Sequence, residues 1–248
     1  MSGPLRWPDG YARHHFEIID STNEEARRRA AAGESGPLWI DAAEQSSGRG
    51  RRGRNWVSPR GNLAATLLIR PAKHARECAQ LSFVAALAAA DALANIAPGI
   101  QFTLKWPNDV LASERKIAGI LLESASATSE PLSWLAIGIG INLMRHPEDV
   151  NFPAVSLASL GVMVSCEDAL TALAASFAKW YETWNKSGFS DVRDAWLARA
   201  AGLGSKIRAR LQNEETAGVF EGIDEQGALI LRESGGGKRH IAAGDVFW

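Results

Sequence analysis

The run Gly48–Arg54 limits most strongly what this chain can fold into, because three glycines and four arginines fill seven consecutive positions. Glycine carries no Cβ and adopts positive φ angles freely, so this backbone can bend sharply and approach a ligand closely. Arginine presents a planar fork of donors that suits carboxylate and phosphate groups. The run therefore predicts a loop that closes over an anion, with a solvated basic loop and a nucleic-acid contact as alternatives.

The charge balance of the whole chain favours a small anionic ligand over a nucleic acid. The sequence of 248 residues has a formal net charge of -1, and 22% of its residues are charged. Proteins that bind nucleic acid through charge are usually basic overall, with the basic residues gathered on one face. Here the positive charge is concentrated in one loop. The hydrophobic content of 46% is enough for one sizeable core with a small second domain.

The sequence shows no pattern typical of secretion, a membrane span or a metal centre. Cys78 and Cys166 stand far apart in no metal-ligand spacing, so we expect two reduced thiols. The N-terminus lacks an apolar signal-peptide core, and residues up to about Ala12 are expected to form a loose leader. The longest charge-free apolar run, residues 81–90, is too short to span a bilayer. These features predict a soluble cytoplasmic protein.

Hydrophobic patterns predict short strands and longer helices through the first two hundred residues. Asp20–Asn23 offers N-cap residues followed by two glutamates, and Gly33 ends the helix that they begin. An alanine-rich apolar segment predicts a buried helix that stops at Pro98. The expected strands cover residues 14–19, 38–43, 62–69, 102–106, 116–123 and 134–141. The alanine-rich helix is expected over residues 77–96, and two further helices are expected over residues 167–184 and 191–200.

The character of the chain changes at about Gly202, where short strands recur between turns. This pattern is typical of a small β-barrel appended to a larger core. We therefore expect a core domain over residues 1–201 and a small β-barrel domain over residues 202–248. The strands expected in the barrel cover residues 206–211, 217–223, 228–232 and 240–242.

The residues that carry chemistry gather at strand ends and in turns, where a rigid sheet holds binding residues on loops. No nucleophile and base pair stands out, the five histidines lie in no zinc-ligand spacing, and no P-loop or dinucleotide fingerprint is present. Many cations without such groups predict catalysis by positioning and electrostatic stabilisation, which suits phosphoryl and adenylyl transfer. Besides the arginine loop, these polar residues are Ser21, Thr22, Asn23, Gln45, Lys105, Asn108, Asp109, Lys116 and Asn142.

The order of these blocks resembles the biotin protein ligase family. Gln45–Trp56 is similar to the arginine–glycine signature loop of the family, and Gly222–Leu229 resembles part of its C-terminal barrel. The other matching blocks are Ser21–Asn23, Lys105–Asp109, Lys116–Leu121 and Gly138–Asn142. The resemblance covers essentially the whole chain. It implies an α+β fold related to class II synthetases and lipoate ligases, with a mixed-sheet catalytic core flanked by helices and a small C-terminal β-barrel.

The resemblance implies an ATP-dependent ligase that works in two steps. The biotin carboxylate attacks the α-phosphate of ATP, which gives biotinyl-5′-AMP and pyrophosphate. A lysine of a biotin carboxyl carrier protein then attacks the mixed anhydride and expels AMP. ATP implies Mg²⁺, for which no protein ligands are expected.

The resemblance also bears on partners. Some members carry an N-terminal DNA-binding domain, whereas only about 20 residues precede Ser21 here, so the ligase without the repressor domain is expected. We expect no nucleic-acid or membrane partner, and a homodimer is in keeping with the family.

The resemblance assigns roles to individual residues of this sequence. Arg51 and Lys116 would stabilise the developing negative charge, and Asp109 would orient or deprotonate the incoming lysine. The expected biotin-binding residues are Ser21, Thr22, Asn23, Gln45, Arg49, Gly50, Arg51, Lys116 and Gly119. The expected ATP-binding residues are Arg51, Arg54, Trp56, Lys105, Asn108 and Asn142, with Trp56 near the adenine.

Simpler alternatives stay open. Ser21–Asn23 can serve only as a helix cap, Lys105–Asp109 only as a turn, and Lys116 only as an exposed strand charge. A lipoate or octanoate ligase or transferase of related fold is the nearest alternative function. A non-catalytic regulator that binds biotin or nucleic acid is the alternative from another class.

Without a ligand the arginine loop is expected to be mobile, because its glycines raise its conformational entropy and its like charges repel.

Overall fold

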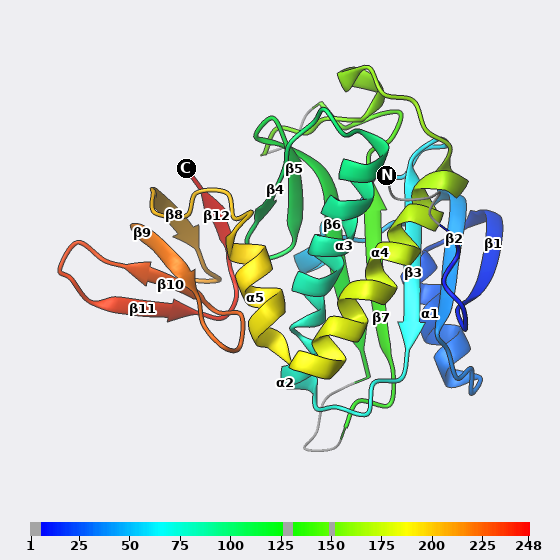
Figure 1. Cartoon of the computed structure of the whole chain (residues 1–248), viewed down its shortest axis with the longest axis horizontal. Helices are drawn as coiled ribbons and strands as arrows, with labels where there is room; N and C mark the ends of the chain where they lie inside the picture. Colours follow the sequence, from blue (N-terminus) through cyan, green and yellow to red (C-terminus); the bar gives the residue numbers. More distant parts are fainter. Residues whose placement is uncertain (1–5, 126–130, 149–151) are drawn as a thin grey trace.

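A seven-stranded sheet forms the centre of the computed structural model, which describes residues 6–125, 131–148 and 152–248 (Figure 1). Its strands are β1 (Ala12–Ile19), β2 (Leu38–Gln45), β3 (Leu63–Ile69), β4 (Phe102–Lys105), β5 (Asp109–Ala112), β6 (Arg115–Ser124) and β7 (Leu135–Ile141). Their order across the sheet is β1-β2-β3-β7-β6-β5-β4. β1 runs parallel to β2, and the other neighbours pair antiparallel, so the sheet is mixed as expected.

Helices cover both faces of this sheet, and the alternation of side chains along β2 decides which helix packs where. Trp39 belongs to the large core that also contains α3 and α4, whereas Ile40 packs with Ala26 and Ala30 of α1 on the opposite face. Figure 1 shows α3 and α4 lying across the same face. The helices are α1 (Thr22–Ala31), α2 (Ala75–Cys78), α3 (Leu81–Ile96), α4 (Cys166–Ser187) and α5 (Phe189–Leu197).

A second, five-stranded antiparallel sheet confirms the β-rich C-terminal unit. Its strands are β8 (Lys206–Arg210), β9 (Glu215–Ile223), β10 (Leu229–Arg232), β11 (Lys238–Ile241) and β12 (Asp245–Phe247), in the order β11-β10-β9-β8-β12. Trp106 joins this sheet to the core, because its indole Nε1 donates to the carbonyl oxygen of Gly227 at 2.9 Å. The division into domains at residues 201 and 202 stays a prediction.

Three local differences from the sequence-based expectations have physical causes. The helix expected over 77–96 is divided into α2 and α3, because the backbone tightens at Gln80, whose amide donates to Glu77 three residues back. The helix expected over 191–200 ends at Leu197, because the backbone of Arg199 and Ala201 pairs with Leu104 of β4 instead. β12 was missed, because three residues are too short to show a periodicity.

The stretch Ala75–Ile96 is long and apolar enough to cross a membrane by length and composition. Its most apolar 18-residue window is 61% buried inside the protein, where it packs against the sheet and α4. The burial is that of a core helix in a folded domain. Of the expected leader, residues 1–5 lie outside the described residues, and β1 already begins at Ala12.

Gly227 gives a test of how tightly the C-terminal sheet packs against α3. It has a φ of +82°, and a Cβ there would lie 2.5 Å from Cε2 of Phe83. Gly236 has a φ of +84°, and a Cβ there would have no neighbouring atom within 4 Å. A substitution at Gly236 therefore measures the backbone strain of a positive φ without a steric clash. Gly236→Ala should cost about 1–2 kcal/mol of unfolding free energy, and Gly227→Ala about 1–3 kcal/mol more, because of the added clash. Urea unfolding measures both, and equal losses would contradict a tight contact at Phe83.

Candidate active site

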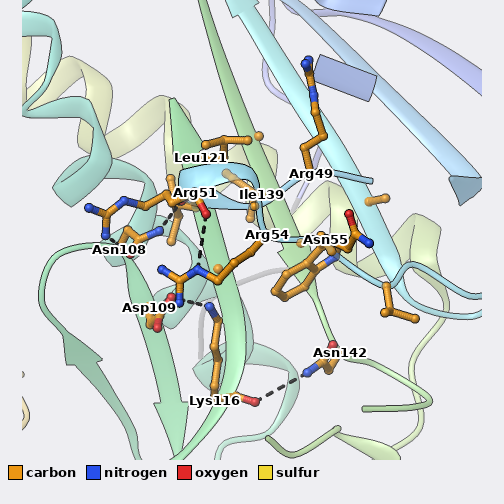
Figure 2. Close-up of a pocket in the computed structure, with 18 of the residues that line it drawn as sticks. Arg49, Arg51, Arg54, Asn55, Asn108, Asp109, Lys116, Leu121, Ile139 and Asn142 are labelled. Atoms are coloured by element: carbon orange, nitrogen blue, oxygen red, sulfur yellow. Dashed lines mark hydrogen bonds and ion pairs between the residues drawn. The ribbon is translucent and has the colours of Figure 1, made fainter. Parts of the chain in front are cut away.

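The residues expected to bind ligands line one cavity of about 450 Å³ on the α1 face of the main sheet (Figure 2). They come from α1, from four strands and from the arginine loop, and they are far apart in the sequence. Members of every expected group are present: Ser21, Thr22, Asn23, Gln45, Arg49, Gly50, Arg51, Arg54, Trp56, Lys105, Asn108, Asp109, Lys116, Gly119 and Asn142. A volume of this size falls in the range of cofactor and substrate sites. The ligand that each residue contacts stays a prediction.

One end of the cavity, which we call the amide end, carries uncharged hydrogen-bonding groups. The backbone amide of Thr22 donates to Gln45 Oε1 at 2.8 Å, and the Thr22 hydroxyl donates to the same oxygen at 3.1 Å. The Thr66 hydroxyl lies 2.7 Å from Thr22 Oγ1 and 2.6 Å from Asn23 Oδ1. The Asn23 amide donates to Glu123 at 2.7 Å. This network fixes the rotamers of buried polar groups, which would otherwise destabilise the fold.

The simple capping role proposed for Ser21–Asn23 is only partly correct. Ser21 occupies the N-cap position of α1 with an extended backbone, but its side chain makes no capping hydrogen bond. The side chain of Gln45 takes over by accepting from the amide of Thr22 in the first turn. The Ser21 side chain is buried at the cavity wall without a capping task, so it remains available to a ligand.

Two glycines form the floor of the cavity. Gly119 of β6 and Gly140 of β7 are direct partners across the sheet. A Cβ on Gly140 would lie 2.3 Å from Cε2 of Trp56, and one on Gly119 would lie 3.2 Å from Cζ3 of the same ring. The indole therefore lies on bare backbone. The alternating glycines of β7 allow a close approach to the strand, by Trp56 at Gly140 and by Asn23 at Gly138.

The arginine loop is folded into a small hairpin. Arg49 pairs with Asn55 in an isolated antiparallel bridge, and a single 3-10 turn, η1 (Arg51–Gly53), lies between them. Arg52 in this turn has a φ of 55°, the left-handed region that costs energy for a residue with a side chain. The compact turn brings neighbouring guanidinium groups close together, so the loop needs anionic partners.

The protein itself supplies these partners from three separate elements. Arg49 NH2 lies 2.9 Å from Glu24 of α1 and 3.3 Å from Glu123 of β6. The other arginines meet Asp245 of β12, with Arg54 NH2 at 3.0 Å from Oδ1. The predicted mobility of the ligand-free loop stays a prediction, but its arginines have ion-pair partners before any ligand arrives.

Arg51 is the most deeply placed arginine of the loop. Its NH1 donates to Asn108 Oδ1 at 3.1 Å, and the Asn108 amide in turn donates to the carbonyl oxygen of Ile120. Burial lowers the pKa of Arg51, and the nearby charges of Asp245 and Asp109 act in the opposite direction. The guanidinium remains charged at any physiological pH, since the ordinary pKa of arginine lies far above that range. Asn108 therefore orients a partly desolvated cation toward the cavity.

Lys116 and Asp109 face each other from β6 and β5 (Figure 2). Nζ lies 2.6 Å from Asp109 Oδ1 as an ion pair, although its approach lacks the angle of a hydrogen bond, so the buried Oδ1 has no hydrogen-bond partner in the described part of the chain. Nζ is also 5.4 Å from the centre of the Trp56 ring. Lys116 is therefore a half-buried cation paired with Asp109, and not an exposed strand charge.

The part of the cavity beside the C-terminal sheet, which we call the cationic end, combines Lys105, which the sequence indicated, with residues that the sequence patterns did not indicate. Lys105 is 5% exposed, and its Nζ lies 4.0 Å from the ring centre of Phe152 and 5.4 Å from that of Phe247. Arg210 and Asp245 of the C-terminal sheet line the same end. These residues stand in no motif, and only the pairing of β8 with β12 brings Arg210 opposite Asp245. Thr66 and Glu123, which hold Thr22 and Asn23 from behind the amide end, were missed for the same reason.

Comparisons with known proteins agree with this arrangement. A model of the "Biotin/lipoate A/B protein ligase family" matches residues 15–142, and a model of the "Biotin protein ligase C terminal domain" matches residues 202–248. The chain therefore belongs to the biotin/lipoate A/B protein ligase family.

Within that family, the chain is similar to several biotin protein ligases. The chain is 49% identical to biotin–[acetyl-CoA-carboxylase] ligase of Paracoccus denitrificans over 92% of this chain and 97% of that protein. Its fold matches biotin protein ligase from Aquifex aeolicus, solved in complex with biotin and ATP, with a TM-score of 0.81 and 27% identity over 95% of this chain and 97% of that chain. It also matches biotin protein ligase from Leishmania major, solved in complex with biotinyl-5-AMP, with a TM-score of 0.61 and 26% identity over 95% of this chain and 100% of that chain.

Lys105 gives a test of the cost of holding a cation at the cationic end. Burial outweighs the attraction of Asp109 and lowers the pKa of Lys105 below its ordinary value. Between the pKa of Lys105 in the folded protein and its pKa in the unfolded chain, unfolding takes up a proton, so the free energy of unfolding rises with pH. Below the folded-state pKa, Lys105 is charged in both states, and its burial destabilises the folded protein fully. Lys105→Met should therefore raise the unfolding free energy at pH 7 by about 1 kcal/mol or more. This advantage should shrink as the pH approaches the unfolded value.

Urea unfolding at pH 7 and pH 10 measures the difference between wild type and Lys105→Met. Lys206→Met, at an exposed lysine of β8, is the matched control and should change stability little at either pH. A loss of stability in Lys105→Met at pH 7 would mean that the ring contacts of the ammonium outweigh its burial.

Proposed function

We propose that this chain is an ATP-dependent biotin protein ligase that forms biotinyl-5′-AMP and transfers biotin to a lysine of a biotin carboxyl carrier protein. The observation that carries the proposal is that one cavity is lined by two chemically different sets of groups, the neutral amide and hydroxyl groups around Thr22 and Gln45 and the cations around Lys116. A cyclic urea needs neutral donors and acceptors, whereas a carboxylate and a nucleotide phosphate need cations. Biotin joined to AMP has these groups in this order.

Biotin recognition is assigned to the amide end. Ser21, Thr22, Asn23 and Gln45 are buried or half-buried there, and the hydroxyl of Thr66 links Thr22 to Asn23. A site whose polar groups are already oriented rejects analogues that lack the matching groups, because those groups would then be left unpaired. This is the reason to favour biotin over lipoate or octanoate, which have no ureido ring.

Adenylate formation is assigned to Arg51 and Lys116, with Arg49 and Gly50 beside the biotin carboxylate. The carboxylate oxygen forms a bond to the α-phosphorus, and the bond from that phosphorus to the bridging oxygen of pyrophosphate breaks. Negative charge on the phosphoryl oxygens is stabilised by fixed cations in a site with little water. Arg54, Lys105, Asn108 and Asn142 would line the nucleotide, and Trp56 would stack on the adenine from its seat on Gly119 and Gly140.

Biotin transfer requires a neutral amine, so the acceptor lysine must lose a proton before it attacks the carbonyl carbon. Among the described residues, Asp109 is a carboxylate of the cavity with one oxygen free of ordinary hydrogen bonds. Once Lys116 turns toward the phosphate, Asp109 can receive the acceptor ammonium and accept its proton, and AMP leaves with the electrons of the anhydride bond.

Mg²⁺ enters the proposal as a partner of the nucleotide phosphates, which supply the oxygen ligands that this cation prefers. Within the described residues, no three His, Cys, Asp or Glu side chains are grouped to hold a metal ion. The acids beside the cationic end, Asp109 and Asp245, are already engaged by cations. The chain fits a metal that arrives with ATP better than a permanently bound one.

The proposal extends to partners and organisation. The acceptor is the biotin carboxyl carrier protein of acetyl-CoA carboxylase or another carboxylase, and the reaction takes place in the cytoplasm. Residues 1–201 would form the catalytic domain that binds biotin and ATP, completed at the cavity by residues of the C-terminal sheet. A homodimer would form most simply where β1 lies at the edge of the main sheet, since an edge strand can pair with a second chain.

The proposal is tested by incubating the protein with biotin, ATP and Mg²⁺, and then with a biotin carboxyl carrier domain. Mass spectrometry should show one biotinyl group on the carrier, and pyrophosphate should be released in the first step. Lipoate or octanoate in place of biotin, with a lipoyl domain as acceptor, is the matched control and should give no transfer. Transfer of lipoate but not biotin would replace the proposal by its nearest alternative, and binding of biotin without pyrophosphate release would favour a regulator.

Separate assays of the two steps test the roles of Lys116 and Asp109. Lys116→Ala should slow adenylate formation roughly ten- to hundred-fold, because a charge-assisted hydrogen bond to the developing charge is lost. Asp109→Asn should slow transfer from preformed biotinyl-5′-AMP more than it slows adenylate formation. Lys179→Ala, at an exposed lysine of α4, is the control for loss of a charge and should change neither rate. An unchanged adenylation rate in Lys116→Ala would remove Lys116 from the site.

A further inference from the structure

One carboxylate of the C-terminal sheet, that of Asp245, forms ion pairs with three arginines of the loop. The side chain of Asp245 is 18% exposed, and its oxygens lie 3.7 Å from Arg51 NH1, 3.3 Å from Arg52 NH1 and 3.0 Å from Arg54 NH2. Arg54 NH2 donates to both oxygens, at 3.0 and 3.1 Å. Three guanidinium groups around two oxygens is the arrangement with which proteins bind phosphate groups.

The position of this carboxylate is fixed by backbone pairing. Asp245 is the direct partner of Arg210 in the β8–β12 ladder. The preceding residue, Gly244, is packed so closely that a Cβ there would lie 3.0 Å from the carbonyl oxygen of Arg210. The carbonyl oxygen of Gly244 also accepts long hydrogen bonds from Arg51, at 3.4 and 3.5 Å. Asp245 is thus a rigid anchor, whereas the arginines belong to a short glycine-rich turn.

The charges around Asp245 are unbalanced in favour of cations. Three arginines share one carboxylate, and the remaining acid of this region, Asp109, is paired with Lys116. A nucleotide that arrives with several negative charges can therefore bind the free donors of the arginines and displace part of their contact with Asp245. Each guanidinium has five N–H donors, so the exchange does not require the loop to open.

We propose that Asp245 is a positioning residue that stands in for a nucleotide phosphate and holds the arginine loop closed before ATP binds. This inference rests on the proposed ligase function, since it names ATP as the anion that replaces the carboxylate. Without Asp245 the three cations repel one another and the ligand-free loop opens. Part of the binding free energy of ATP is then used to close the loop, so the apparent affinity for ATP falls, although the bound complex is the same.

The test uses the variant Asp245→Asn, which keeps the shape of the side chain and removes its charge. Trypsin cleavage after Arg52 and Arg54 in the ligand-free protein should become roughly tenfold faster, the effect expected of several partly exposed ion pairs together. Biotin with ATP should restore protection. The KM for ATP should rise by a similar factor, and kcat should change less than about twofold.

Two matched variants separate positioning from a general loss of structure. Asp245→Glu keeps the charge and should stay close to wild type in cleavage rate and KM. Glu221→Gln removes an acid of the same sheet that is paired with Arg232 and Lys238, away from the loop, and should leave loop cleavage and KM unchanged.

The outcomes separate this inference from the proposed function. Loop cleavage in ligand-free Asp245→Asn that equals wild type, or that is matched by Glu221→Gln, overturns the role of Asp245. A wild-type protein that forms no biotinyl-5′-AMP overturns the proposed function, and with it ATP as the replacing anion. Faster cleavage in Asp245→Asn alone, with protection by biotin and ATP and a raised KM, supports both.

Discussion

Four arginines in seven residues repel one another, and the conformation of this loop depends on carboxylates that other parts of the chain bring to it. Glu24 comes from α1, Glu123 from β6 and Asp245 from the C-terminal sheet. None of them is near the loop in sequence. The loop is therefore held at the meeting point of three elements, and the geometry of the cationic end depends on how the two sheets are joined. The joint itself is tight, with Gly227 packed against Phe83 and hydrogen-bonded to Trp106.

The two faces of the main sheet are used differently. On one face, α3 packs against the strands and α4 with a nearly continuous surface of alanine and leucine, which supplies apolar burial. On the other face, the strands carry Thr66, Gly138 and Gly140 in place of large apolar residues. The hydrogen bonds that join Thr66 to Thr22 and Asn23 offset the stabilisation that buried apolar side chains would give at these positions. The division lets the chain keep a stable core beside a cavity lined with polar groups.

Much of the fold was predictable because it is encoded locally. Apolar runs indicated most of the strands, and Gly33 and Pro98 indicated where α1 and α3 end. What the sequence could not indicate is long-range pairing. The end of α5 is set by the pairing of residues 199–201 with β4, and β12 exists because β8 offers it a partner. The site divides in the same way. Motif residues such as Lys116 and Asn108 were predictable. Asp245 and Arg210 line the cavity, and Thr66 contacts Thr22 beside it, only because the chain folds.

The bare strands under Trp56 have a consequence for how such a cavity can change. Its floor is main chain at Gly119 and Gly140, and glycine is already the smallest residue. Any substitution there can only make the cavity shallower, and none can deepen it. Variation in ligand size must therefore be accommodated by the indole above the floor or by the side walls. The cavity is therefore as deep as this backbone allows, and substitutions at Gly119 or Gly140 can only reduce its depth.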